Sequence, residues 1–357
     1  MNGFWELLIR PALEAAGARE IVEVGSEGGL HTLRLLEWCA ARGARLHVIE
    51  PEPQYDVAAM RAAHPGRLVF HEATSLERLD AIGPVDAVLL DGDHNWYTVY
   101  HELLALEAAS APGFPLVLLH DVAWPFARRD LYYAPGRIPG PYRHPYAKGG
   151  VRRGESKLLQ DEGLAPELYK ALEEGGPRNG VLTAVEDFLE KTSLRLRFEL
   201  VPVDFGLGFL ASEALLAARP ALRELLDGLQ APDFGLRLAL HMEERRIDCM
   251  VPLQRENDRL RREVTRVVHE LGEYQAELGR HEVEVKRLRG MLADVHAEIA
   301  AARVEIAASH AERAAAQAES AAAHAEAARV VSSRSWRLTA PLRRAAALLR
   351  GRGDTGR

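Results

Sequence analysis

Residues 19–50, REIVEVGSEGGLHTLRLLEWCAARGARLHVIE, contain the pattern that decides the fold. A short apolar run at 19–24 leads into a glycine-rich turn at 25–29, and apolar residues with helical spacing follow from 30 to 41. A second apolar run, 45–50, ends in an acid. Strand, glycine turn, helix and strand in this order predict a parallel β-α-β unit.

The same alternation continues along the chain. Apolar runs recur at 67–71, 85–91 and 116–120, with helical stretches between them, as in a parallel sheet that is covered on both faces. Two last runs, 194–201 and 205–210, are joined by a short turn and predict a hairpin. We therefore expect an α/β fold: a doubly wound, mostly parallel, seven-stranded Rossmann-like sheet with a terminal antiparallel strand.

The length and composition bound the organisation of the chain. It has 357 residues, which suggests about two modules, and a net charge of −7, which offers no basic field to attract nucleic acid. Cys39 and Cys249 have no metal-type spacing and form no disulfide framework. No signal peptide or transmembrane run is visible, so we expect a cytoplasmic protein.

Changes of composition suggest four segments, the first of them with an insertion. We expect a globular domain at 1–212 with an insertion or lid at 122–178, a helix and linker at 213–240, a coiled coil at 241–330 and a basic amphipathic tail at 331–357.

The glycine-rich turn is the first candidate site. Gly25 and Gly28 let a ligand approach the backbone, and the start of the following helix faces that ligand. The spacing G-x-x-G-G differs from the G-x-G-x-x-G of dinucleotide-binding folds, which argues against an NAD-dependent oxidoreductase. Glu50 closes the second strand, where a carboxylate can accept both ribose hydroxyls; the alternative is a solvated acid at a strand end.

The second candidate site lies at the ends of two later strands. Asp91, Asp93 and His94 follow one strand, and His120 and Asp121 follow the next. Carboxylates and imidazoles at neighbouring strand ends can hold a divalent cation and a proton acceptor together. The alternative is structural: Asp91 caps the next helix and His120 packs in the core.

Four stretches carry a resemblance to a known family: EVGSEGG (23–29), HVIEPEP (47–53), VDAVLLDGDHNWYTVYHEL (85–103) and LVLLHDVAW (116–124). With them, residues 19–212 resemble class I S-adenosylmethionine-dependent methyltransferases. The resemblance is closest to the branch that contains metal-dependent sugar O-methyltransferases of macrolide pathways and cephalosporin-hydroxylase-like proteins. The D-G-D-H-x-x-Y element is the most specific of these features.

The resemblance implies a role for each site residue. The cofactor S-adenosylmethionine would contact these residues: Glu23, Gly25, Ser26, Gly28, Glu50, Ala73, Thr74, Ser75 and Asp91. A divalent metal ion would have Asp91 and Asp121 as ligands, with His120 beside them, and catalysis would fall to His94, as general base, and Asp93. Many metal-dependent relatives have Glu-Asp where this chain has His120-Asp121, and a histidine ligand favours a softer ion than Mg²⁺.

The implied activity is methyl transfer to a hydroxyl of a sugar, polysaccharide or glycosylated metabolite. The alternative is a non-catalytic scaffold in glycan assembly, whose methyltransferase-like domain binds but does not transfer.

The insertion at 122–178 is rich in Pro, Gly, Tyr and Arg. A segment of this length without a periodic pattern is typical of a functional lid or of disorder, and its many aromatic residues argue against disorder. We expect a substrate lid that contacts the acceptor through Arg128, Arg129, Tyr132, Tyr133, Tyr142 and His144. The alternative is a loop that only packs on the surface.

From Leu253 to Ile306, residues at alternating steps of three and four form one row that is mostly apolar, which predicts self-association through a coiled coil rather than a solvated single helix. Asn257 occupies one position of this row. The tail around Trp336 resembles a short element at the ends of bacterial polysaccharide glycosyltransferases. Its arginines and leucines predict contact with glycan-synthesis enzymes or with the inner face of the cytoplasmic membrane, whereas the alternative is a frayed terminus.

Overall fold

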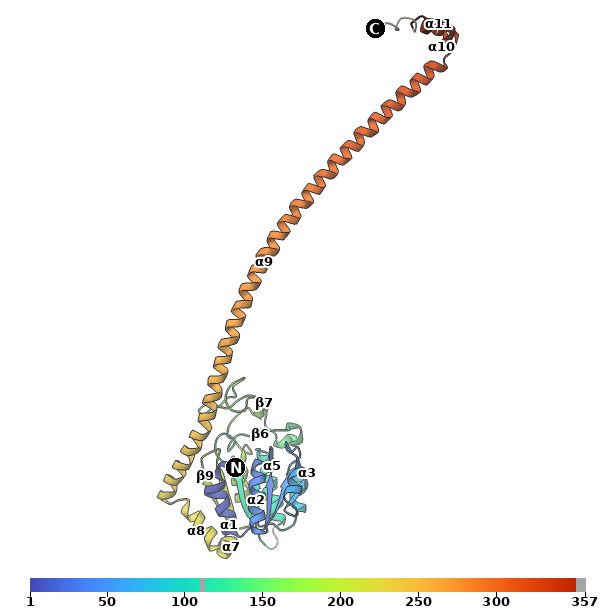
Figure 1. Ribbon diagram of the computed structural model, residues 1–357. Helices are drawn as coiled ribbons and strands as arrows, with labels where there is room; N and C mark the ends of the chain where they lie inside the picture. The colour runs from blue at the N-terminus through green and yellow to red at the C-terminus, as the bar shows by residue number, and fades with distance from the viewer. Residues whose placement is uncertain (110–112, 351–357) are drawn as a thin grey trace. The chain divides into compact units, whose positions relative to one another are not determined.

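The computed structural model describes residues 1–109 and 113–350, with side chains to residue 347. The chain divides into two compact units, 1–251 and 252–357 (Figure 1). The first unit holds the sheet that the sequence predicts, and the second is helical where it is described.

Seven strands form the main sheet in the order β3-β2-β1-β4-β5-β10-β9. Their bounds are β1 Glu20–Val24, β2 Arg45–Ile49, β3 Leu68–His71, β4 Ala87–Leu90, β5 Leu116–His120, β9 Leu196–Val201 and β10 Leu207–Ser212. Strands β1 to β5 pair in parallel, whereas β10 pairs antiparallel with both β5 and β9. The Rossmann-like methyltransferase sheet is therefore confirmed, and its antiparallel strand, last in sequence, lies one place in from the edge.

The register of the parallel strands positions the site. Val24 pairs with Ile49 on one side and with Leu90 on the other, and Leu90 pairs with Leu119. The residues that follow these four in sequence therefore emerge at the same edge of the sheet. They are Gly25, Glu50, Asp91 and His120, all of them expected site residues.

Two apolar clusters cover the two faces because successive strand residues point to opposite sides. Ile21 belongs to one cluster, whereas Val22 and Val24 belong to the other. The first cluster packs against helical turns at Asn2–Phe4 and Trp5–Ile9 and against α1 Arg10–Ala16, α2 Leu30–Arg42, α7 Glu213–Ala218 and α8 Pro220–Gly228. The second packs against α5 Trp96–Ala109 and α6 Val181–Lys191. Two short helices, α3 Val57–Ala63 and α4 Ser75–Arg78, flank β3.

The insertion at 122–178 contains a small sheet of its own. Strands β6 Leu131–Tyr132, β8 Tyr169–Ala171 and β7 Tyr146–Lys148 pair antiparallel in that order. Short helical turns lie between β6 and β7, at Pro135–Arg137 and Gly140–Tyr142. The sequence gives no periodic signal here because strands of two or three residues are too short to show one.

The expected helix and linker at 213–240 fold as α7, α8, a short break and the start of the next helix. Pro232 opens a single helix, α9 Pro232–Ser332, instead of breaking one. Proline is well tolerated in the first turn of a helix, where its missing N–H would have no partner in any case. The first turns of α9 belong to the folded unit: Phe234 is buried in the first cluster, and His241 Nε2 lies 2.8 Å from the carbonyl oxygen of Gly3.

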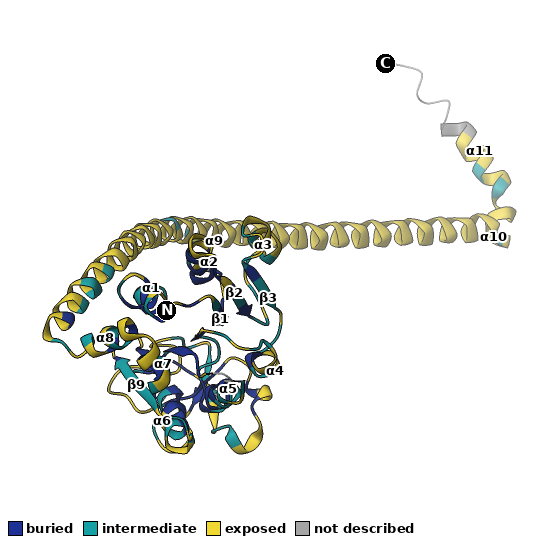
Figure 2. Ribbon diagram, turned by 90° about the horizontal axis from the view of Figure 1, so that it is seen from below, coloured by how far each residue is buried: buried dark blue, intermediate teal, exposed yellow. Residues whose placement is uncertain are grey.

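Most side chains of α9 are exposed along its length (Figure 2). Two short helices follow, α10 Arg334–Leu338 and α11 Ala340–Arg350, and Ser333 caps the first of them through a 3.1 Å bond from Trp336 N. The end of the expected tail, 351–357, lies outside the described residues, as do the side chains at 348–350. Among the residues described, no helix has the length and apolar character to span a membrane.

Candidate active site

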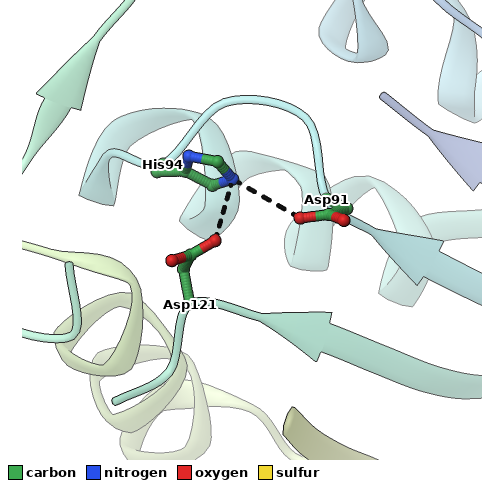
Figure 3. A group of neighbouring side chains, drawn as sticks. All are labelled: Asp91, His94 and Asp121. Atoms are coloured by element: carbon green, nitrogen blue, oxygen red, sulfur yellow. Dashed lines mark ion pairs between the residues drawn. The ribbon is translucent and has the colours of Figure 1, made fainter. Parts of the chain in front are cut away.

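Two carboxylates and two imidazoles meet at the ends of β4 and β5. His120 Nδ1 lies 3.0 Å from Asp91 Oδ1 and 2.9 Å from Asp121 Oδ2. His94 Nε2 faces the same two oxygens, at 3.6 Å from Asp91 and 3.2 Å from Asp121 (Figure 3). The amino group of Met1 also contacts Asp91, at 3.1 Å from Oδ2. The structure thus brings together four of the residues that the sequence singles out.

Both ring nitrogens of His94 are buried, yet neither has a hydrogen-bond partner among the described residues. The contacts of Nε2 with the two carboxylates are close enough for ion pairs but lack the direction of hydrogen bonds. Its ring stacks on Phe126, with centroids 5.9 Å apart, and contacts the exposed ring of Tyr133 at the same separation. An imidazole whose buried nitrogens have no hydrogen-bond partner points to a bound ion or to a reacting group.

His120 is oriented from its other side. Its Nε2 lies 3.1 Å from the carbonyl oxygen of Asp204, in the turn between β9 and β10. A carbonyl only accepts, so Nε2 carries the proton and donates. When the ring is neutral, Nδ1 carries no proton, and its lone pair points toward the two carboxylates. Metal-binding histidines are commonly held in this way.

The charges of the cluster shift one another's pKa values. Burial acts to lower the pKa of His120, but the carboxylates of Asp91 and Asp121 outweigh it and raise the pKa to about 10. For His94, burial again acts downward, and Asp121 and Asp91 again raise the pKa above its usual value. Burial would raise the pKa of Asp91, but His120 and His94 hold it well below the usual range.

Two further acids lie behind His94. Asp93 accepts a 3.0 Å hydrogen bond from the hydroxyl of Thr98 through Oδ2, while its Oδ1 has no partner among the described residues. Burial raises the pKa of Asp93, and it raises the pKa of Glu102 to about 8. Both acids border a narrow gap that His94 and His120 also line. The sequence identifies Asp93 but not Glu102, which looks like an ordinary helix residue.

The glycine turn touches the acidic cluster directly. Gly25 has φ +83°, and a Cβ built there would lie 2.4 Å from the carbonyl oxygen of Asp91. Only glycine fits this position. Gly29 has φ +73°, and its Cβ would meet the ring of Tyr55 at 2.8 Å, whereas Gly28 faces open space. The expected cofactor turn and the expected metal ligand are thus in van der Waals contact.

Glu50 braces the glycine turn. One of its oxygens accepts hydrogen bonds from the backbone N–H groups of Ser26, at 2.9 Å, and Glu27, at 3.0 Å. The other oxygen accepts from Glu52 N at 3.0 Å. A carboxylate has about four acceptor sites, so the residue still has capacity for a hydroxyl group. Ser26 Oγ accepts a 3.1 Å hydrogen bond from the hydroxyl of Tyr55.

Glu23 is buried, and both of its oxygens have partners on α2. Oε1 lies 2.9 Å from His31 Nδ1, and Oε2 accepts a 2.7 Å hydrogen bond from Thr32. The structure therefore assigns Glu23 a bracing role between β1 and α2, next to its expected place in the cofactor site.

Three of the expected cofactor-binding residues, Ala73, Thr74 and Ser75, follow β3. Thr74 forms a reciprocal cap with Glu77 at the start of α4, and Ser75 is buried. With Ala73 they lie after the end of β3, which pairs in parallel with β2, the strand that Glu50 follows.

The lid residues do not form one surface. Arg129 and Tyr132 are buried: Arg129 donates to the carbonyl oxygens of Ala171, Leu172 and Ser156, and the hydroxyl of Tyr132 donates to Asp130. Their polar groups are thus already paired within the protein, and the expected contact with the acceptor stays a prediction.

Three other lid residues also have partners within the first unit. Arg128 pairs with Glu186, Tyr142 packs on the rings of Trp96 and Tyr97, and His144 Nε2 lies 2.9 Å from the carbonyl oxygen of Arg178. Of the six expected residues, Tyr133 is the one whose ring contacts His94.

Asp130, which the sequence does not single out, fastens the lid to the sheet. Its Oδ1 accepts hydrogen bonds from Trp96 N and Gly180 N, both at 2.7 Å, so it caps α5 from a distance. Asn95 caps the same helix locally, with Oδ1 2.9 Å from Thr98 N. Leu131 N donates to the carbonyl oxygen of His94 at 3.0 Å. Asp91 therefore does not cap α5, and its carboxylate faces the cluster.

Comparison with known proteins agrees with this architecture. Residues 22–122 match a family model described as a methyltransferase domain. No curated protein matches the chain in sequence.

Similar solved structures include a methyltransferase of Podospora anserina with S-adenosylhomocysteine (18% identity, 59% of this chain and 78% of that one, TM-score 0.36). A second is a putative caffeoyl-CoA O-methyltransferase of Staphylococcus aureus (14%, 56% and 78%, TM-score 0.32). A third is human N-acetylserotonin methyltransferase with S-adenosylmethionine (15%, 58% and 52%, TM-score 0.33). Residues 22–122, from β1 to the end of β5, are thus similar to a methyltransferase domain, within a sheet of the Rossmann-like methyltransferase type.

Proposed function

We propose that this protein is an S-adenosylmethionine-dependent O-methyltransferase that acts on a hydroxyl of a sugar, polysaccharide or glycosylated metabolite. One observation carries the proposal: His94, whose buried ring nitrogens have no hydrogen-bond partner, lies between the carboxylates of Asp91 and Asp121 at the strand ends that adjoin the glycine turn. Bound S-adenosylmethionine supplies an electrophilic methyl group. The residues of this chain have to hold it, orient the acceptor and take up the hydroxyl proton.

His94 is the group placed to take that proton. Asp91 and Asp121 raise its pKa against the effect of burial, which makes the ring a stronger base. Phe126 and Tyr133 fix the plane of the ring from two directions. Tyr133 is 55% exposed, so its ring can also lie against a sugar face, which supports the sugar as acceptor.

The cluster also fits a divalent metal ion. Asp91, His94 and Asp121 each offer a ligand atom, and these atoms lie within 4.8 Å of one another. Ligands at about 2.0–2.2 Å from a metal lie about 2.9–3.6 Å apart, which matches the distances of both imidazoles to the two carboxylates. Asp91, Asp121 and His120 would hold the ion, which supplies a positive charge that lowers the pKa of a bound hydroxyl.

An ion at this position would also reach His94 Nε2, which faces the same oxygens. His94 would then be a ligand and not the base. Two observations favour Zn²⁺, an ion between hard and soft in its ligand preference, over Mg²⁺. Imidazole nitrogens supply half of the donor atoms, and His120 Nε2 is held by the carbonyl oxygen of Asp204.

The test is transfer of labelled methyl from S-adenosylmethionine to an extracted glycan fraction. His94→Ala should abolish transfer and keep cofactor binding, while His269→Ala, on the exposed surface of α9, should change neither. His94 is a metal ligand if a chelator stops transfer by the wild type and His94→Ala weakens metal binding. If the enzyme is insensitive to the chelator, His94 is the base. If the protein binds the cofactor but transfers methyl to no glycan, the result would support the alternative function, a non-catalytic scaffold in glycan assembly.

A further inference from the structure

The row from Leu253 to Ile306 lies on the surface of α9, within the second unit. Its large apolar members are between 45% exposed, at Val285, and 69% exposed, at Leu253. They are Leu253, Leu260, Val264, Val267, Leu271, Tyr274, Leu278, Val285, Leu288, Leu292, Val295, Ile299 and Ile306. An apolar stripe of this length calls for a partner, and we propose that the partner is a second copy of the chain, parallel and in register.

The charges beside the row fix the direction. Starting at Asn257, every seventh residue forms one half of the row, and the residue just before each of these positions is Glu in seven cases of eight. These residues, which we call the acidic flank, are Glu256, Glu263, Glu270, Glu277, Glu284, Glu298 and Glu305, with Met291 at the eighth place. The flank on the other side of the row is mixed and includes Arg261, Arg289 and Arg303.

These three arginines have no ion pair on the isolated helix, in the part of the chain that the structure describes. Arg289 and Arg303 have no acid three or four residues away on either side. Members of the acidic flank do pair with arginines further round the helix, such as Glu284 with Arg287 at 2.6 Å. Such exposed pairs are weak, so they do not compete strongly with contacts across an interface.

A parallel pair brings the two flanks together. In that arrangement a flank residue faces the residue five positions later in the other copy. Three acids of one copy then face arginines of the other: Glu256 faces Arg261, Glu284 faces Arg289 and Glu298 faces Arg303. The one unfavourable charge pair is Glu277 with Glu282.

In an antiparallel pair whose helices overlap over the same residues, the acidic flank of one copy would lie against the acidic flank of the other. Glu256 would face Glu305, Glu263 would face Glu298 and Glu277 would face Glu284, with no arginine to offset them. Like charges opposite each other destabilise a pair of helices.

Asn257 gives an independent argument. In a parallel, in-register pair the two Asn257 side chains face each other and can hydrogen-bond, an arrangement that fixes register. In the antiparallel alternative Asn257 would face Ala302, and a buried amide would lose its partner. Charge and amide therefore favour the same arrangement.

Cysteine cross-linking of the full chain tests the direction. Cys249 is exposed and is first changed to Ser, while Cys39 is buried. Leu292→Cys should then form a disulfide-linked dimer on mild oxidation, and the outward-facing Ala293→Cys should not. In the antiparallel alternative residue 292 lies opposite residue 267. A cross-link that appears only when Leu292→Cys is mixed with Val267→Cys would overturn the proposal, as would a monomeric wild type in sedimentation.

A charge exchange tests the flanks. Arg289→Glu with Arg303→Glu should weaken self-association by about tenfold or more, because each of the two symmetric seams then holds two like-charge contacts in place of two ion pairs. Mixing this variant with a Glu284→Arg, Glu298→Arg chain should restore association as a mixed pair. Failure of the mixture to associate, with both chains folded, would contradict the pairing of the flanks.

Discussion

His120 Nε2 and the main-chain carbonyl oxygen of Asp204 lie 3.1 Å apart, and this contact connects the hairpin turn of β9 and β10 to the acidic cluster. The last two strands of the sheet thus orient a residue that the fifth strand carries. An imidazole held on one side presents its other nitrogen in a fixed direction.

The turn should therefore control the metal site through its contact with His120. Gly206 has φ +93°, and a Cβ there would meet Ala123 N at 2.6 Å, so Gly206→Ala should displace the turn and release His120. We expect metal affinity to fall by roughly tenfold or more, measured by calorimetry with Zn²⁺. Gly66→Ala is the matched control because Gly66 also has a left-handed φ, +72°, but has open space around it. Equal losses in both variants would argue against the turn as the cause.

The glycine turn offers a second contrast. Gly25→Ala should cost at least about 2 kcal/mol of unfolding free energy, because its Cβ would be forced against the backbone of Asp91 and Gly92. Gly28→Ala faces open space and should leave the melting temperature unchanged while it weakens S-adenosylmethionine binding. Thermal melts and calorimetry separate the two effects. Normal cofactor affinity in Gly28→Ala would remove that residue from the cofactor site.

Glu102 should make stability depend on pH. Its pKa is raised by burial from 4.5 to about 8, so the folded protein holds a proton that the unfolded chain releases between these values. The stability gained from the protonated form is complete below pH 4.5 and is lost as the pH rises toward 8, at up to about 1.4 kcal/mol per pH unit. Glu102→Gln keeps a neutral group and should flatten this slope. Urea unfolding at several pH values measures it, and parallel slopes in both proteins would refute the assignment.

Asp130 should hold the lid to the sheet. Asp130→Ala removes the acceptor of Trp96 N and Gly180 N, and leaving two buried N–H groups unpaired should cost roughly 2–4 kcal/mol. Asp130→Asn keeps an acceptor oxygen for both and should cost much less. Limited proteolysis should cut 122–178 faster in the alanine variant only. Equal resistance of both variants to cleavage would mean that other contacts hold the lid.

The sequence predicts the sheet well because buried parallel strands appear as uninterrupted apolar runs. All seven main strands fall within a few residues of their expected positions, and the strand-end residues Gly25, Glu50, Asp91 and His120 emerge together because register is set by the sheet. The lid was not predictable in the same way. Its strands of two or three residues carry no period, and nothing in the sequence shows that Arg129 is buried on backbone carbonyls.

Partners distant in sequence explain most other differences. Asp130 caps α5 from 34 residues away, and Asp204 orients His120 from 84 residues away. No local spacing encodes such contacts. Glu23 shows the same limit from closer range: its place after a strand is visible in sequence, but its bonds to His31 and Thr32 depend on how α2 packs.

The backbone of Asp121 has φ +61°, a left-handed conformation that an aspartate adopts at an energetic cost. Its carboxylate is held by His120 Nδ1 at 2.9 Å and by His94 Nε2 at 3.2 Å, so the backbone conformation is the part that works against folding. Asp121→Gly and Asp121→Ala both remove these ion pairs, but only glycine relieves the backbone. We expect neither variant to transfer methyl and the glycine variant to melt at the higher temperature, because the free energy stored in this backbone is the fold's contribution to a prepared site.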